Sequence, residues 1–325
     1  MRAIVIEEFG GPEVLTTVEL PEPDPGPGEV TIDVAFAGVN FADIKARADG
    51  YRVPKLPFRP GMDVSGTVRA VGDGVSGIVP GQEVAAFMRG GGYAQIAVAP
   101  AATVFPLPHG VSLRTAAALP TVLPTAYALL HEIGRLREGD TVLIHSAAGG
   151  VGTIAGQLAR MGGASGVYGT VSSLAKAEHA LKSGYDQVFE AADFDADVLA
   201  VTGGRGVDLA LDSVGGETFH RTLQVLARFG RLVNFGNARG AEPWQTAAAE
   251  IAPRAISVAG FSMLSMAGED PQALRTLAER AFSLLTDSGV ELPITAEFPL
   301  EEAGRAHELV ESRTTTGKLL LRVPA

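Results

Sequence analysis

A glycine-rich segment at residues 147–152 has the residue types and the spacing that bind a phosphate. It reads Ala147-x-Gly149-x-x-Gly152, so alanine stands at the first glycine of the G-x-G-x-x-G pattern. The free N–H groups and the positive dipole end of a helix can receive a pyrophosphate if no side chain obstructs the backbone. We expect Gly149 to permit this close approach and Gly152 to let the helix pack on the preceding strand. The candidate cofactor contacts in the turn are Ala148, Gly149, Gly150, Val151 and Gly152.

The segments on either side of the turn have the pattern of a βαβ unit. An apolar strand from Thr141 to His145 precedes it, an amphipathic helix follows it, and a second strand runs from Gly166 to Val171. A glycine pattern alone is weak evidence, because many tight turns carry glycine for steric reasons. The strand before it and the helix after it favour a dinucleotide site.

The residues after the second strand indicate which dinucleotide is bound. NAD-binding folds place an Asp or Glu here against the ribose hydroxyls, and its charge repels a 2′-phosphate. In this chain residues 170–176 read TVSSLAK and contain no acid. The hydroxyls of Ser172 and Ser173 and the cation of Lys176 suit a phosphate, which predicts NADPH. A serine N-cap followed by a solvated lysine on a helix surface would give the same pattern.

Composition limits the classes of function. The chain has 325 residues, 46% of them hydrophobic, which is enough for two domains with apolar cores. A formal net charge of −11 argues against a nucleic acid or an anionic membrane as partner. The absence of cysteine excludes disulfides and thiolate zinc sites, and the six histidines show no H-x-x-x-H spacing, so no metal site is expected. The N-terminus lacks the apolar run of a signal peptide, and we expect a cytoplasmic location.

The elements that must position the turn divide the chain into regions of different character. Residues 1 to about 121 are β-rich, with short strands separated by Gly and Pro clusters. A helical pattern runs from Thr115 to Leu136, and residues 140 to about 260 alternate strands and helices, which predicts a parallel sheet. We then expect helices at Pro271–Ser288 and from Pro299, and a strand at Lys318–Val323 that returns to the first domain. The other expected elements are strands at Arg2–Glu7, Glu29–Ala37, Asp63–Val71, Glu83–Phe87, Val207–Asp212, Gly230–Phe235 and Ile256–Phe261, and a helix at Thr218–Leu226.

Several separated segments jointly match one known family. They are GVNFADIKARADGY (38–51), PFRPGMDVSGTV (57–68), LPTVLPTAYALL (119–130), HSAAGGVG (145–152), GTVSSLAKAEHALKSG (169–184) and TTGKLLLRV (315–323). Over nearly its full length, the chain resembles the medium-chain dehydrogenase/reductase superfamily. Within it, the chain resembles the zinc-free quinone oxidoreductase family, which includes ζ-crystallin and related enoyl reductases.

The resemblance implies an α/β protein with two domains. Residues 1–121 would begin a GroES-like, β-rich catalytic domain, and residues 263–325 would return to it. Residues 122–262 would form a Rossmann domain with a doubly wound parallel sheet, and the active site would lie in the cleft between the domains. A homodimer joined through Rossmann strand edges is also implied, with residues 256–261 as the pairing strand.

The implied activity is a zinc-independent, NADPH-dependent reduction of a quinone or an α,β-unsaturated carbonyl. Zinc members of the superfamily carry a catalytic Cys and a GHE motif, where this chain has Asn40-Phe41 and Gly61-Met62-Asp63. An enoyl-thioester reductase or a biosynthetic enone reductase is the alternative within the enzyme class. A protein that binds NADPH without turnover is the alternative outside it.

Without a metal, the protein must align the hydride donor with the acceptor and hydrogen-bond the developing oxyanion. Asn40 matches the family asparagine near the nicotinamide, and its amide would orient the ring or meet a carbonyl oxygen; otherwise it bonds its own turn. Tyr51 stands where the family often has a tyrosine near the substrate. Its phenol can donate a proton or a hydrogen bond, although it can equally be an amphipathic rim residue.

Four further cofactor contacts are implied by the resemblance. Thr125 matches a family threonine near the nicotinamide, although helix capping accounts for its hydroxyl as well. Phe235 and Gly236 match an element at the carboxyl edge of a Rossmann strand, where ligands of doubly wound sheets bind. Lys318 lies in a segment that returns to the cofactor cleft in the family, although a surface lysine before an edge strand would also fit.

Overall fold

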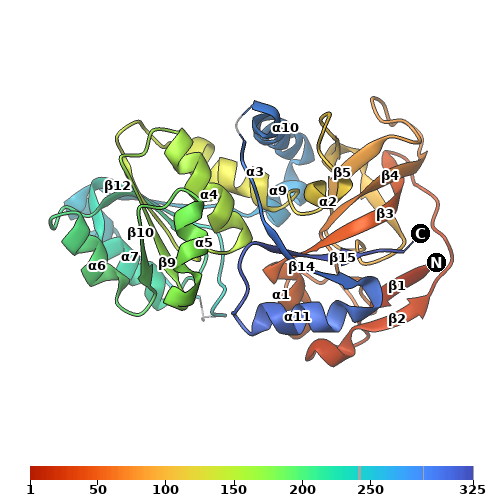
Figure 1. The fold of residues 1–325 in the computed structure, drawn as a ribbon, viewed down its shortest axis with the longest axis horizontal. Coiled ribbons are helices and arrows are strands. Elements are labelled where there is room, and N and C mark those ends of the chain that lie inside the picture. Colours follow the sequence, from red (N-terminus) through yellow and green to blue (C-terminus); the bar gives the residue numbers. More distant parts are fainter. Residues whose placement is uncertain (241–242, 288, 325) are drawn as a thin grey trace. The chain divides into compact units, whose positions relative to one another are not determined.

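The computed structural model describes residues 1–240, 243–287 and 289–324, and the chain divides into two units (Figure 1). The first unit consists of Met1–Pro124 with Leu264–Ala325, and the second of Thr125–Met263. Each unit has its own sheet and its own apolar core. No helix in the described ranges combines the length and the apolar character that a membrane span needs.

The first unit is built on a mixed sheet in the order β14-β15-β3-β4-β5-β7, with β6 also paired to β3. Alternate residues of β3 and β4 face the core, where Val30, Ile32, Val64 and Val68 are buried. The C-terminal strand β15 lies between β14 and β3, which confirms its predicted return to the first domain. The strands of this unit are β1 (Arg2–Val5), β2 (Thr16–Glu19), β3 (Glu29–Val39), β4 (Asp63–Val71), β5 (Glu83–Phe87), β6 (Ile96–Pro100), β7 (Val104–Pro106), β14 (Ile294–Pro299) and β15 (Lys318–Arg322).

Three strands of this sheet bring their ends together. β3 runs antiparallel to both neighbours, with its Gly38 opposite Asp63 of β4 and opposite Leu320 of β15. The carboxyl end of β3 therefore meets the amino ends of β4 and β15. Asn40, which follows β3, comes to the same edge as Asp63 and Lys318, the first residues of the two neighbouring strands.

Helices of the first unit cover this sheet and connect its strands. Helix α1 begins directly after Asn40, and α11 contributes buried Ala303 and Ala306 to the core. Their bounds are α1 (Phe41–Asp49), α2 (Leu113–Ala116), α10 (Pro271–Asp287) and α11 (Ala303–Glu311), together with α9 (Met263–Glu269), whose first residue is the last of the second unit. Ser288, the predicted last residue of α10, lies outside the described residues.

The segment with a helical pattern, Thr115 to Leu136, is divided between separate helices in the structure. Helix α2 ends at Ala116, helix α3 spans Val122–Tyr127, and a π-helix continues over Ala128–Ile133. Pro120 accounts for the interruption, because a proline lacks the backbone N–H and disfavours the helical conformation of the residue before it. The helical character of most of this segment was therefore predicted correctly.

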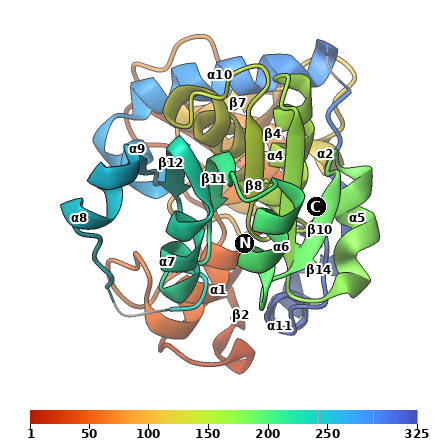
Figure 2. The ribbon, with the colours of Figure 1, turned by 90° about the vertical axis from the view of Figure 1, so that its left-hand side faces the viewer.

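The second unit is a parallel sheet in the order β10-β9-β8-β11-β12-β13, with helices packed along it (Figure 2). Numbered within this unit, the strand order is that of a Rossmann fold, and the predicted α/β doubly wound class is confirmed. The order reverses between β8 and β11, where such folds bind their ligand. The elements are β8 (Thr141–Ile144), α4 (Gly150–Met161), β9 (Gly166–Val171), α5 (Ala177–Lys182), β10 (Gln187–Glu190), α6 (Phe194–Val201), β11 (Val207–Asp212), α7 (Glu217–Gln224), β12 (Leu226–Asn234), α8 (Ala248–Ile251) and β13 (Ser257–Gly260).

Candidate active site

The nucleotide turn, residues 146–152, connects β8 to helix α4. Ser146 has a positive φ of 58°, and Gly149 is extended, with φ −80° and ψ 172°, at the N-cap of the helix. The N–H of Gly149 donates to the carbonyl oxygen of Ser146 at 2.9 Å, which closes the turn. The first N–H groups of a helix have no acceptor within it. Those of Gly150, Val151 and Gly152 are therefore suited to a phosphate.

Two glycines of the turn have different steric surroundings. A Cβ atom at Gly152 would lie 2.4 Å from the carbonyl oxygen of Ser146 and 2.7 Å from that of Ala147, so only glycine fits between helix and turn. A Cβ atom at Gly149 would meet the oxygen of Ser146 at 3.3 Å, a tight contact. Gly152 is thus required by the packing of the fold, whereas Gly149 leaves open the face of the turn that a phosphate would approach.

The loop after β9 holds the residues predicted to contact a 2′-phosphate. Ser172 and Ser173 are exposed, and the Oγ of Ser173 accepts the N–H of Ala175 at 3.3 Å, so this serine caps a short 3₁₀ turn that includes Lys176. A carboxylate oxygen of Glu190, at the end of β10, accepts a backbone N–H of the same loop at 3.4 Å. Sequence reasoning missed this acid, because only the pairing of β9 with β10 places it there. The phosphate contacts stay a prediction.

The reversal of strand order brings three segments to one edge of the sheet. The hydroxyl of Ser213, after β11, donates to that of Ser146 at 3.0 Å. The N–H of Phe235 donates to the carbonyl oxygen of Asp212 at 2.8 Å, and a Cβ atom at Gly236 would lie 2.7 Å from the carbonyl oxygen of Ser213. Phe235 and Gly236 therefore lie against the strand end next to the nucleotide turn. Their contact with a nicotinamide is consistent with this position and stays a prediction.

His145 is a buried residue between the end of β8 and the nucleotide turn. Its Nδ1 lies 2.9 Å from the hydroxyl of Thr170 and its Nε2 lies 2.8 Å from the hydroxyl of Thr222. Burial lowers the pKa of His145 to about 4, so the ring is neutral near pH 7. It connects β9 to helix α7 and has the packing role that its place in an apolar strand suggests.

Thr125 opens the second unit and is buried. Its hydroxyl donates to the Sδ of Met263 at 3.6 Å. Met263 is the last residue of the same unit, so this contact closes the unit where the chain enters and leaves it. Sequence reasoning missed Met263, which carries no motif.

In the first unit, buried Asn40, Asp63 and Lys318 at the strand ends form a polar cluster with half-buried Thr121. The amide Nδ2 of Asn40 donates to Asp63 Oδ2 at 2.9 Å, and Lys318 Nζ donates to the same oxygen at 3.1 Å and to Asn40 Oδ1. The hydroxyl of Thr121 donates to Asp63 Oδ1 at 2.6 Å. Asp63 is fully buried, and Asn40 and Lys318 are 7% and 3% exposed. The structure therefore places the amide of Asn40 in this cluster and Lys318 in the interior, not on the surface.

Asp43 lies under the cluster on the first turn of α1. Its carboxylate accepts the backbone N–H of Asn40 at 2.9 Å and that of Gly61 at 3.1 Å, which joins the end of β3 to the segment before β4. Burial raises the pKa of Asp43 to about 7; the N–H of Asn40 opposes this shift, and the nearby charge of Asp63 adds to it. Asp43 thus fixes the backbone of Asn40, while the cluster fixes its side chain.

Tyr51 lies beyond the end of α1 and is 39% exposed. It lines a small pocket together with Asp43 and Met62, and the pocket also includes Arg52 and Arg89. The guanidinium of Arg52 lies 5.9 Å from the centre of the Tyr51 ring. The phenol is accessible to a ligand, and its role as a proton donor stays a prediction.

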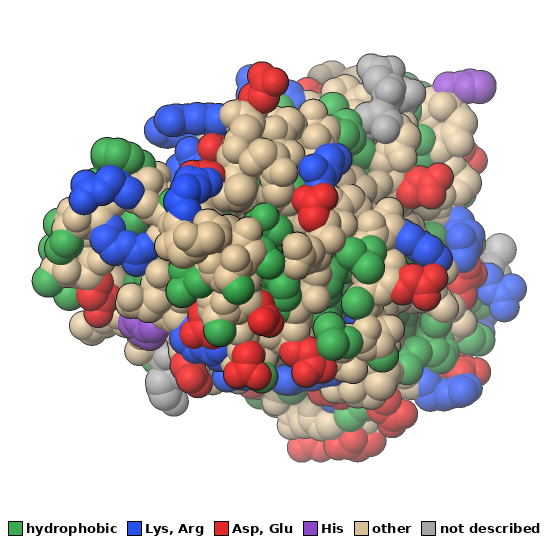
Figure 3. Space-filling view, turned by 60° about the vertical axis from the view of Figure 1, so that its left-hand side comes forward, with side chains coloured by type: hydrophobic (Ala, Val, Ile, Leu, Met, Phe, Trp, Pro, Cys, Tyr) green, Lys and Arg blue, Asp and Glu red, His purple; other side chains and the backbone are tan. Residues whose placement is uncertain are grey.

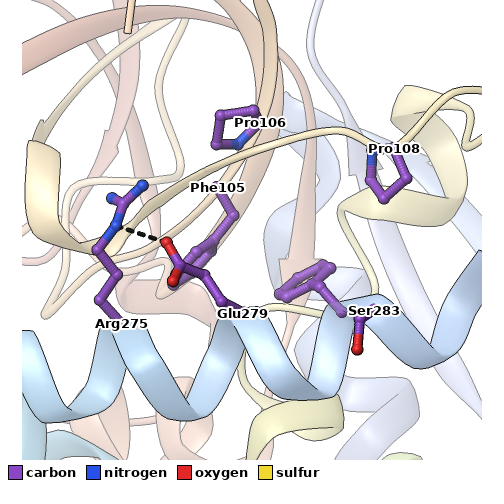
Figure 4. A pocket seen from close by; sticks show the side chains of 7 residues that line it. Phe105, Pro106, Pro108, Arg275, Glu279 and Ser283 are labelled. Carbon is purple, nitrogen blue, oxygen red and sulfur yellow. Dashed lines mark hydrogen bonds and ion pairs between the residues drawn. The ribbon is translucent and has the colours of Figure 1, made fainter. Parts of the chain in front are cut away.

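A second pocket of the first unit contains none of the predicted site residues. It has a volume of about 320 Å³ and lies between β7 and helix α10 (Figure 4). Phe105 and Phe282 stack in its wall with their ring centres 5.2 Å apart, and Arg275 pairs with Glu279 at 2.8 Å. Because its charged side chains already pair with each other, this pocket offers little to recognise a polar ligand.

Comparison with known proteins identifies the family. Residues 26–109 match the alcohol dehydrogenase GroES-like domain, and residues 150–280 match the family described as zinc-binding dehydrogenase. The quinone oxidoreductase of Rattus norvegicus is 35% identical over 99% of this chain and 97% of its own length. The chain belongs to the quinone oxidoreductase family of the medium-chain dehydrogenase/reductase superfamily.

Solved structures agree with this membership. The quinone oxidoreductase of Escherichia coli in complex with NADPH superposes on this family member with a TM-score of 0.91 at 33% identity, covering 99% of this chain and 100% of the other. A mycobacterial protein in complex with NADPH gives a TM-score of 0.92 at 35% identity, with the same coverage. The predicted family is confirmed.

The donor set of this quinone oxidoreductase family member does not fit the zinc named in one matching description. The chain has no cysteine, and the described ranges contain no group of three or more His, Asp or Glu side chains placed to hold a metal. The polar cluster contains an amide and an ammonium, and the ammonium of Lys318 already occupies the place of a cation beside Asp63.

Proposed function

We propose that this protein reduces a quinone or an α,β-unsaturated carbonyl compound with NADPH by metal-free hydride transfer. The observation that carries the proposal is the buried cluster of Asn40, Asp63 and Lys318. Asn40 and Asp63 of this cluster lie in the two segments where zinc-dependent relatives carry their Cys and GHE motifs. The cluster presents hydrogen-bond donors, which are the groups that stabilise a developing oxyanion in the absence of a metal.

Family membership and the NADPH complexes of its structural neighbours make this chain an NADPH-dependent oxidoreductase. The turn fits the cofactor for two reasons. Position 152 has no room for a Cβ atom, so glycine lets the helix pack closely on the turn, and the N-terminus of helix α4 offers free N–H groups to a phosphate. When bound, NADPH supplies the hydride. We assign its binding to Thr125, Ala148, Gly149, Gly150, Val151, Gly152, Ser172, Ser173, Lys176, Phe235 and Gly236.

The chain's own residues hold the acceptor and balance its charge. Hydride arrival at an electron-poor carbon moves negative charge to the acceptor oxygen, and a hydrogen bond from Asn40 stabilises that charge. Tyr51, accessible at the small pocket of the first unit, supplies the proton. Lys318 supports Asn40 from within the cluster, and its own contact with the cofactor remains part of the proposal.

The proposed partners are small molecules and a second copy of this chain. The net charge is −11, and on the face shown in Figure 3 basic side chains are interspersed with acidic ones. Such a surface supports a small-molecule substrate over a nucleic acid. Strand β13 is an edge of the second sheet, so its outer side is the proposed pairing edge of a homodimer. The cytoplasmic location stays a prediction from sequence.

The test is NADPH oxidation, followed at the nicotinamide absorbance, against a panel of quinones, small enones and enoyl thioesters, with NADH in parallel. We expect turnover of quinones or enones and a preference for NADPH. Turnover of enoyl thioesters alone would select the alternative enzyme. Tight NADPH binding without turnover of any acceptor would replace the proposal with a non-catalytic NADPH-binding role.

A further inference from the structure

The buried cluster determines which way the amide of Asn40 faces. The ammonium of Lys318 can only donate, so it must meet the amide oxygen, and the carboxylate of Asp63 can only accept, so it must meet the amide nitrogen. The two groups hold opposite ends of one amide. A flipped amide would face its oxygen to a carboxylate and its NH₂ to an ammonium, which is unfavourable at both ends.

One hydrogen of this amide remains available. The nitrogen carries two hydrogens, of which one is donated to Asp63 at 2.9 Å. The second has no hydrogen-bond partner among the residues that the structure describes. A buried polar hydrogen without a partner is unfavourable unless a ligand satisfies it.

The fold is built to keep the cluster in place. A Cβ atom at Gly38 would lie 2.4 Å from the carbonyl oxygen of Ala117. It would also lie 3.0 Å from the Cβ of Asp63 and 3.2 Å from the Cε of Lys318, so only glycine fits beside the backbone and these two side chains. Thr121 holds the other oxygen of Asp63 at 2.6 Å. Asp63 and Lys318 begin β4 and β15, and Asn40 stands between the end of β3 and the start of α1, so regular elements hold all three backbone positions.

We propose that Asp63 and Lys318 are positioning residues that hold Asn40 as a hydrogen-bond donor to an oxygen of the acceptor. This inference rests on the proposed function and specifies its substrate class: the acceptor presents a carbonyl-type oxygen, not a donor group, to Asn40. Asn40 is the catalytic residue. Asp63 and Lys318 act through it.

The test is a set of variants that shows whether Asp63 and Lys318 act through Asn40 or independently of it. Asn40→Ala should lower kcat about 100-fold, the usual effect of losing one donor to a developing oxyanion. Asp63→Asn combined with Lys318→Met keeps the side-chain volumes, removes both charges together and frees the amide; we expect a loss of at least about 10-fold. Adding Asn40→Ala to this double variant should then give no more loss than Asn40→Ala alone. The dissociation constant for NADPH should stay within about twofold of the wild-type value throughout.

Two results would overturn the inference while leaving the proposed function intact. If the triple variant loses about 1000-fold, the product of the separate losses, then Asp63 and Lys318 act independently of Asn40. If Asn40→Ala weakens NADPH binding as much as it lowers kcat, then Asn40 serves the cofactor and not the acceptor. Glu178→Gln with Lys182→Met is the matched control, since these residues form an exposed ion pair at 2.7 Å in the second unit. It should leave kcat unchanged.

A readout without turnover keeps the inference separate from the proposed function. In a ¹H–¹⁵N spectrum, the side-chain amide of Asn40 is assigned as the signal missing in Asn40→Ala. Its two protons should differ strongly in chemical shift, because only one is hydrogen-bonded to a carboxylate. The difference should be smaller in the Asp63→Asn, Lys318→Met variant. An unchanged difference in a folded double variant would refute the positioning. The wild-type pattern in a protein without turnover would refute the proposed function alone.

Discussion

Two glycines of the nucleotide turn, only three residues apart, should respond differently to the same substitution. In Gly152→Ala, the new Cβ would lie 2.4 Å from the carbonyl oxygen of Ser146, and it must move to at least 3.0 Å, so helix α4 must shift by at least about 0.6 Å. Such overpacking costs about 1–3 kcal/mol. In Gly149→Ala the contact is 3.3 Å and φ is −80°, so the stability of the unit should change little.

Gly149→Ala should instead weaken cofactor binding. Its Cβ would stand at the N-cap of helix α4, where the phosphate approaches the free N–H groups. We expect the dissociation constant for NADPH to rise at least about tenfold, which corresponds to about 1.4 kcal/mol. Gly152→Ala should combine weaker binding with a less stable second unit, because the shift of the helix moves those N–H groups.

The assay uses the single tryptophan of the chain. Trp244 lies in the second unit, 5.8 Å from the ring of Phe219, so its fluorescence in a urea titration reports the unfolding of this unit. NADPH titrations of both variants give the affinities. The reasoning is refuted if Gly149→Ala binds NADPH as tightly as the wild type, or if Gly152→Ala unfolds at the wild-type urea concentration.

Three further predictions concern Lys176, Tyr51 and His145. Lys176→Ala should raise the KM for NADPH far more than that for NADH, because only NADPH carries a 2′-phosphate; equal effects in steady-state kinetics would contradict the phosphate contact. Tyr51→Phe should lower kcat on enones and leave the NADPH dissociation constant unchanged. A kcat equal to that of the wild type would show that Tyr51 is a rim residue and not the proton donor. His145 has a folded pKa of about 4 against an ordinary value of 6.5, so the unfolded state binds more protons and stability falls as the pH decreases from about 6.5 to 4. Between pH 7 and 5 this single group should cost about 2 kcal/mol, and His145→Gln should weaken the pH dependence of unfolding measured by Trp244 fluorescence; an unchanged slope would show that His145 is not buried and neutral.

Local patterns predicted most of the second unit. The strand at Val207–Asp212 has the predicted bounds, and the strand at Gly166–Val171 likewise. Apolar periodicity and glycine spacing are properties of short sequence segments, so they predict local structure independently of distant parts of the chain. The strand predicted at Gly230–Phe235 starts four residues earlier, at Leu226, because Leu226 pairs with Val207 of β11.

The polar cluster of the first unit could not be derived from the sequence. Its members lie far apart in the sequence, with a separation of 278 residues from Asn40 to Lys318, and no local pattern marks Asp63 as a partner of either. The sequence signals were Asn40-Phe41 and Gly61-Met62-Asp63, which depart from the motifs of zinc-dependent relatives without showing what replaces the metal ligands.

The sequence by itself determined the backbone features that depend on neighbours in the chain: the nucleotide turn, its strand and its helix, and the absence of thiolate ligands. Only the tertiary structure decided the orientation of the amide of Asn40 and the burial of Lys318. Both depend on the antiparallel register that places β3 between β4 and β15. A one-residue change in that register would turn every side chain of a strand to the opposite face, so the site exists only once the whole sheet has formed.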